Sequence, residues 1–229
     1  WIDERKDGTH VRVVKVDRRL TPLGPERRLA TTQGSATDLR LFSRDGRTLA
    51  VWSEANDPER PGQADLYLAT LSNRDASLLV KTEAVAKTPA HSYSPTLGAI
   101  DGGLLLSWLE SAGSTEQERA HVALAQLDPE GRPASARTRL PITHGTPSSL
   151  AMDCSGHTCR VMMAIEREHR AELWAATVEG EPSPPPKRLS RLGGPSGQSP
   201  PLVLLGPQLY YADLNTEGRG RVREMLVEW

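Results

Sequence analysis

The sequence lacks the features that mark several common classes of protein. It has no run of about 18 apolar residues, so no segment is predicted to cross a membrane as a helix. Its 28 basic and 29 acidic residues are interspersed and leave a net charge of -1. Because a nucleic-acid surface needs a basic patch or stripe, we expect no nucleic-acid partner. Only five basic residues are lysine, an imbalance typical of codon bias rather than of a ligand site.

Contiguous catalytic motifs are also missing. The chain has no Gly-x-Ser-x-Gly elbow, no phosphate loop and no Gly-x-Gly-x-x-Gly turn. Its six histidines never stand two or four residues apart, which is the spacing of a metal pair on one strand or helix. The sequence alone therefore assigns no catalytic, cofactor-binding or metal-binding residue.

What the chain does have is an internal repeat. A short apolar run ends in Trp52-x-Glu54, and a similar run ends in Trp108-x-Glu110. The same template fits three other places more loosely, and the five residues taken as equivalent are Trp1, Trp52, Trp108, Ala164 and Ala212. They are separated by 51, 56, 56 and 48 residues. A repeat period of this size is typical of propellers and solenoids.

Each repeat offers four short apolar runs joined by turns that carry glycine or proline. Turns such as Arg44–Arg47 and Ile100–Gly103 place glycine where a tight strand connection needs a positive φ. We therefore predict an all-β fold, a β-propeller of four-stranded antiparallel blades of about 50 residues. A β-sandwich is the alternative, but it gives no reason for a marker at near-constant intervals.

The repeat divides residues 1–229 as a single β-propeller domain. The predicted units are a partial blade, three complete blades and a second partial blade, at 1–36, 37–90, 91–145, 146–195 and 196–229. This count predicts either part of a larger propeller or a small ring closed by complementing terminal strands. Both ends look like strands, so we expect this chain to be a piece of a longer protein and to associate with the rest of it.

One unit resembles a known propeller repeat. The segment 42–54, followed by 64–71, is similar to the TolB-type blade, which reads Phe-Ser-x-Asp-Gly-x-x-Leu-Ala and then Asp-Leu-Tyr. The match is close in this blade of about 50 residues and decays in the others. The resemblance implies a propeller. It implies no single activity, because such blades occur in periplasmic scaffolds, peptidase gating domains and lyases.

The two cysteines indicate the compartment. Cys154 and Cys159 flank four residues of a predicted hairpin, where two cysteines can lie close enough to bond. Two buried thiols or a metal pair with His157 are the alternatives, although one Cys-x4-Cys is poor zinc spacing. We predict a disulfide, and with it an extracytoplasmic location: the periplasm, the cell surface or the medium.

The function predicted from these observations is a non-catalytic binding or scaffold module. It would belong to an extracytoplasmic bacterial protein and engage a protein or glycan partner through one loop face. The alternative is the propeller portion of an enzyme, either a glycan-active propeller or the gating domain of a peptidase. Glu54, Glu110 and Glu166 bear on this choice. We expect them to be strand-end residues, whereas carboxylates paired in an axial funnel would favour the enzyme.

Overall fold

The computed structural model is built from β-strands alone in the part of the chain that it describes. That part covers residues 1–57, 59–60, 62–112, 120–143, 145–167, 170–179, 184–191, 202–205, 207–214 and 220–227. No helix long and apolar enough to cross a membrane occurs among these residues. The prediction of an all-β protein is confirmed.

The strands form five antiparallel sheets, each following the order of the chain. Sheet I holds β1 (Ile2–Arg5), β2 (Gly8–Val13) and β3 (Arg27–Thr32). Sheet II holds β4 (Ser35–Arg44), β5 (Arg47–Ala55), β6 (Asp65–Ser72) and β7 (Leu78–Ala86). Sheet III holds β8 (His91–Ile100), β9 (Gly103–Ser111), β10 (His121–Leu127) and β11 (Thr138–Arg139). Sheet IV holds β12 (Thr146–Ser155), β13 (Thr158–Arg167), β14 (Arg170–Val178) and β15 (Lys187–Arg191). Sheet V holds β16 (Leu202–Leu205), β17 (Gln208–Leu214) and β18 (Gly220–Leu226).

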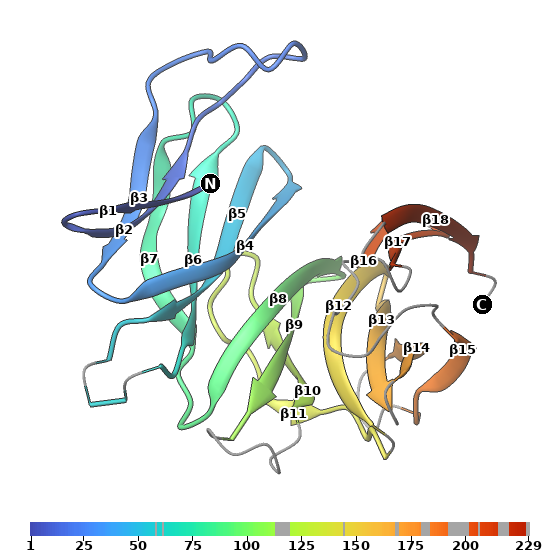
Figure 1. The fold of residues 1–229 in the computed structure, drawn as a ribbon. Coiled ribbons are helices and arrows are strands. Elements are labelled where there is room, and N and C mark those ends of the chain that lie inside the picture. The colour runs from blue at the N-terminus through green and yellow to red at the C-terminus, as the bar shows by residue number, and fades with distance from the viewer. Residues whose placement is uncertain are drawn as a thin grey trace.

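The five sheets stand side by side in chain order and make an open arc, from the blue sheet I to the red sheet V in Figure 1. Neighbouring sheets meet most closely through their first strands, because β4 contacts β8, β8 contacts β12, and β12 contacts β16. We call these four the inner strands. Sheet I contributes no inner strand from the described residues, and β4 contacts β1 and β2 there instead.

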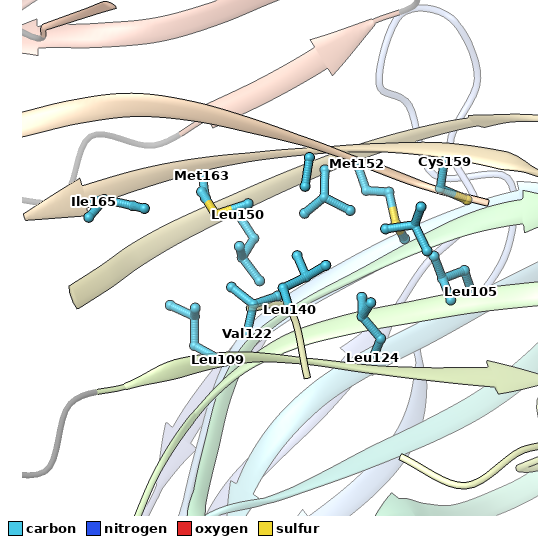
Figure 2. Packing of buried hydrophobic residues seen from close by; sticks show 13 residues of the cluster. Leu105, Leu109, Val122, Leu124, Leu140, Leu150, Met152, Cys159, Met163 and Ile165 are labelled. Atoms are coloured by element: carbon cyan, nitrogen blue, oxygen red, sulfur yellow. The ribbon is translucent and has the colours of Figure 1, made fainter. Parts of the chain in front are cut away.

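The second strands explain why the sheets stack. Six of the nine residues of β5 and eight of the nine residues of β9 are buried, because each strand lies between two neighbouring sheets. Such strands read as continuous apolar runs rather than as alternating ones. Figure 2 shows the core between sheets III and IV, where Leu109 and Leu124 face Leu150 and Met163. The apolar runs thus supply the contact that holds each sheet to the next.

Tryptophan marks one repeated position in this stack, but two predicted equivalences are wrong, those of Ala164 and Ala212. Trp52 and Trp108 are buried, and each packs against the preceding sheet. Ala164 instead packs against sheet V, and Met163 takes the place of the tryptophan. The reason is that a residue's place in the stack depends on how many residues separate it from the hairpin turn before its strand. Each of the three equivalent residues follows the first residue of its second strand by five positions.

The predicted disulfide is present. Cys154 and Cys159 are directly paired across the β12–β13 hairpin, with a Cα–Cα distance of 4.1 Å. The bridge packs on the neighbouring inner strand, since a methyl group added at Gly98 of β8 would lie 2.2 Å from the Cys154 Sγ. The amide of Asp101 also donates to the Gly156 carbonyl oxygen, at 3.0 Å. Sheets III and IV are therefore joined at their hairpin ends.

Candidate functional site

Two inner strands carry the same backbone irregularity near their first residues. The pairing of β4 with β5 shifts between Thr37 and Arg40, and the pairing of β8 with β9 shifts between Tyr93 and Thr96. Asp38 and Ser94 lie inside these bulges with φ of 56° and 50°. Positive φ is uncommon for residues other than glycine. Bulges and strained residues both concentrate at functional sites, which directs attention to this end of the sheets.

The two bulges are in contact. The backbone N–H of Ser94 donates to the Asp38 Oδ2 at 2.9 Å, across the junction of sheets II and III. Asp38 is itself only partly buried. The bond therefore fixes a partly accessible carboxylate of one inner strand beside the backbone of the next.

Two rings lie next to this carboxylate on β8. His91 and Tyr93 are stacked, with ring centroids 5.1 Å apart and planes inclined by 25°. Both side chains are partly buried. Burial raises the pKa of the Tyr93 hydroxyl, and the negative charges of Asp38 and Glu166 raise it further. Burial lowers the pKa of His91, against a smaller opposing effect of Asp38.

Glu166 brings a second carboxylate from a third sheet. It lies near the end of β13, opposite Thr146 at the start of β12, and is partly buried. Its negative charge is one of the causes that raise the pKa of the Tyr93 hydroxyl. Sheets II, III and IV therefore contribute to one group, which we call the central cluster: Asp38, His91, Tyr93 and Glu166.

The other two glutamates named from the sequence, Glu54 and Glu110, are buried, and their carboxylates already have hydrogen-bond partners. The Trp52 indole Nε1 donates to the Glu54 Oε2 at 2.9 Å. Glu110 is bonded to the His121 Nε2, 2.9 Å from its Oε2, and to the Arg137 guanidinium. These carboxylates are structural groups at strand ends, with side chains as partners.

Glu166 differs from Glu54 and Glu110 because it is out of phase with them. Ile165, not Glu166, lies seven residues after the first residue of its second strand, the place that Glu54 and Glu110 hold in theirs. Ile165 is buried, and Glu166 follows on the opposite face of β13. The near-constant sequence interval grouped Glu54, Glu110 and Glu166 as equivalent, whereas Glu166 occupies a different position in its sheet.

Sequence reasoning missed Asp38, His91 and Tyr93. The apolar runs predicted the inner strands to begin at about residues 39 and 95, whereas β4 and β8 begin four residues earlier in each case. The polar residues just before each run were therefore left in loops. A signal was available, because Asp38 and Ser94 stand directly before equivalent runs in two repeats.

The hairpin end of the sheets has a cavity, but its side chains are less suited to catalysis than those of the central cluster. A hollow of about 300 Å³ lies between the hairpins of sheets II and III, and Arg44, Arg47 and Glu130 are among its lining residues. The Arg44 guanidinium donates to the carbonyl oxygens of Ile100 and Gly103. Arg47 lies 3.6 Å from Glu130. These arginines therefore already have partners, so we favour the central cluster as the site.

By sequence, no family model and no curated protein matches the chain. Solved structures do resemble it. Native Bacillus subtilis arabinanase Arb43A is 12% identical with a TM-score of 0.53, over 85% of this chain and 74% of that one. A Xanthomonas citri GH43_1 enzyme complexed with xylotriose is 13% identical with a TM-score of 0.55, over 98% and 85%.

A sialidase is also similar. Trypanosoma rangeli sialidase, in complex with 2,3-difluorosialic acid, is 9% identical with a TM-score of 0.58, over 97% of this chain but only 39% of that one. These neighbours are β-propeller enzymes, and at such low identity the likeness shows the β-propeller fold.

The prediction of a non-catalytic binding or scaffold module is contradicted. The structural neighbours are glycoside hydrolases and sialidases, which favour the alternative of a glycan-active propeller. The prediction relied on the absence of any contiguous catalytic motif. A propeller gathers a site from separate strands, so Asp38 and Glu166 stand 128 residues apart in sequence and form no motif.

Proposed function

We propose that this chain is a glycan-active β-propeller that cleaves a glycosidic bond at the central cluster. One observation carries the proposal: three successive sheets direct Asp38, Glu166 and the stacked rings of His91 and Tyr93 to one region. The resemblance to glycoside hydrolase propellers over nearly the whole chain supports it.

The chemistry of the cluster matches that reaction. Glycoside hydrolysis uses two carboxyl groups, one as general acid and the other as general base or nucleophile. Asp38 and Glu166 would form this pair, since both carboxylates act on the Tyr93 hydroxyl. The rings of Tyr93 and His91 offer an apolar surface with polar edges, suited to the mixed faces of a sugar. The partner we propose is accordingly a glycan.

The location we propose is extracytoplasmic. The Cys154–Cys159 disulfide supports it, since such bonds persist in oxidising compartments and are rare in the cytosol.

Hydrolysis assays on arabino-, xylo- and sialyl-oligosaccharides test the proposal. With the substrate that is cleaved, Asp38→Asn and Glu166→Gln should each lower kcat/KM at least about 100-fold, because each removes an acid or base group. Asp153→Asn is the matched control: Asp153 lies on inner strand β12 but next to its hairpin end, and its loss should leave the rate unchanged.

Activity that survives in both carboxylate variants would overturn the proposal, as would cleavage of none of these glycan classes by the intact protein. Near-ultraviolet circular dichroism of each variant separates a lost site from a lost fold.

A further inference from the structure

The hydrogen bonding of His91 fixes which of its ring nitrogens carries the proton. The backbone N–H of Ala64 donates to the His91 Nδ1 at 3.0 Å. A backbone amide can only donate, so the Nδ1 must be the acceptor and hold no proton. A neutral imidazole has one protonated nitrogen, which places the proton on Nε2.

This donor is held firmly in place. Residue 64 also accepts at its carbonyl oxygen, from the Ser92 N–H at 2.8 Å, so two bonds join it to β8. The loop that carries it is braced by Arg60, whose guanidinium donates to Asp57 and Asp65, each at 2.8 Å, and to the Thr88 carbonyl oxygen. Stacking on Tyr93 restrains the ring plane as well.

The other nitrogen is open. Within the part of the chain that the structure describes, no group accepts from the His91 Nε2, and this atom is not among the buried polar atoms without a partner. The Nε2–H is therefore a donor accessible from solvent, on a ring beside Asp38 and Tyr93.

We propose that His91 binds the glycan as a neutral hydrogen-bond donor through Nε2–H, and that Ala64 and Arg60 are positioning residues that set this tautomer. The assignment of the ligand as a glycan rests on the proposed function; the tautomer does not. The acceptor would be a hydroxyl or ether oxygen of the sugar. His91 is accordingly a recognition group rather than a general base, because its only unprotonated nitrogen is already bonded to Ala64.

Protonation of the ring would oppose the same arrangement. A second proton on Nδ1 would point at the Ala64 N–H, and burial already lowers the pKa of His91, with Asp38 as the nearby charge that acts against this. The ring thus stays in its neutral form near pH 7.

Long-range ¹H–¹⁵N spectra of the labelled protein test the tautomer directly, and a spectrum of His91→Asn assigns the signals. We expect the Nε2–H form alone for His91, and a shift toward a mixture in Arg60→Ala. An Nδ1–H form or a mixture in the intact protein would overturn the tautomer assignment. A wild-type spectrum in Arg60→Ala would remove Arg60 from the mechanism.

Binding of the cleaved oligosaccharide to a pair of variants tests the donor. His91→Phe keeps a stacking ring but has no donor, and should weaken binding roughly tenfold. His91→Asn keeps an N–H donor and should lose less. Equal binding by His91→Phe and the intact protein would refute the donor role. If the intact protein binds none of the oligosaccharides, the proposed function and the ligand both fail, and the spectra still decide the tautomer.

Discussion

The junction between sheets I and II differs from the junctions further along the chain. The same inner-strand position, three residues before the end of the strand, holds Leu41, Leu97, Met152 and Leu202 in sheets II to V. Leu41 is 58% exposed, whereas Leu97, Met152 and Leu202 are 7%, 8% and 5% exposed. The residue type is nearly constant, whereas the exposed fraction of Leu41 is about seven to twelve times that of the other three, so what differs is the neighbour.

That neighbour is the preceding sheet. Leu97 packs in a core with Leu49 and Val51 of sheet II, whose inner strand β4 also contacts β8. Leu41 faces sheet I, where the close contacts of β4 are with β1 and β2. Whether this position is buried therefore depends on how closely the preceding sheet packs against it. The central cluster lies at the closely packed junctions, between sheets II, III and IV.

The largest expected effect separates Leu97 from Leu41. Leu97→Ala removes a buried side chain and should cost about 2 to 5 kcal/mol of unfolding free energy. Leu41→Ala should change it by less than about 0.5 kcal/mol, because an exposed leucine loses little contact. Urea unfolding of the two variants measures both. Equal losses would show that the junctions do not differ as described.

Loss of the disulfide should have the next largest effect. Replacing Cys154 and Cys159 together by alanine releases a short closed loop, which chain-entropy arithmetic puts at about 2 kcal/mol of stability. The effect belongs to the sealed junction of sheets III and IV. Urea unfolding of the intact protein with and without reductant gives the same comparison, and unchanged midpoints would contradict it.

Gly98→Ala should cost about 1 to 3 kcal/mol, because the new methyl group would overlap the Cys154 Sγ of the constrained bridge. Removing both cysteines in the same chain should recover part of this loss. Gly24→Ala is the matched control, since nothing lies within 4 Å of a methyl group there and its φ is not positive. A Gly98 variant as stable as the Gly24 variant would refute the close packing of sheets III and IV.

The smallest effect is a dependence of stability on pH through His91. Burial lowers the pKa of this side chain in the folded protein, so the unfolded chain takes up the proton first on acidification. The contribution of His91 to the unfolding free energy is therefore complete above the ordinary histidine pKa of about 6.5. It is lost as the pH falls through the lower pKa that His91 has in the folded protein.

The difference in unfolding free energy between the intact protein and His91→Asn should therefore become smaller as the pH is lowered from 7 to 5. His121, whose pKa is lowered by burial and by Arg139 against Glu110, contributes in the same sense and stays in both proteins. A His91→Asn difference that grows on acidification would contradict the sign.

The sequence predicted the strands of the core better than the site. Trp52 and Trp108 were recognisable because a buried strand between two sheets is apolar throughout, and Cys154 and Cys159 because a hairpin sets their distance. The TolB-type pattern remains a prediction. The central cluster could not be predicted in the same way. Asp38 reaches it through a β-bulge and a hydrogen bond from the Ser94 N–H, and neither feature follows from a local sequence pattern.

The location of glycan contact tests the central claim most directly. Backbone amide spectra of the ¹⁵N-labelled protein, recorded while the cleaved oligosaccharide is added to an Asp38→Asn variant, report which end of the sheets it touches. The account predicts shifts at His91, Ser94 and Glu166, with the amides of Asp101 and Gly156 at the hairpin end unchanged. Shifts confined to the hairpin end, with the amides of the central cluster unmoved, would contradict it.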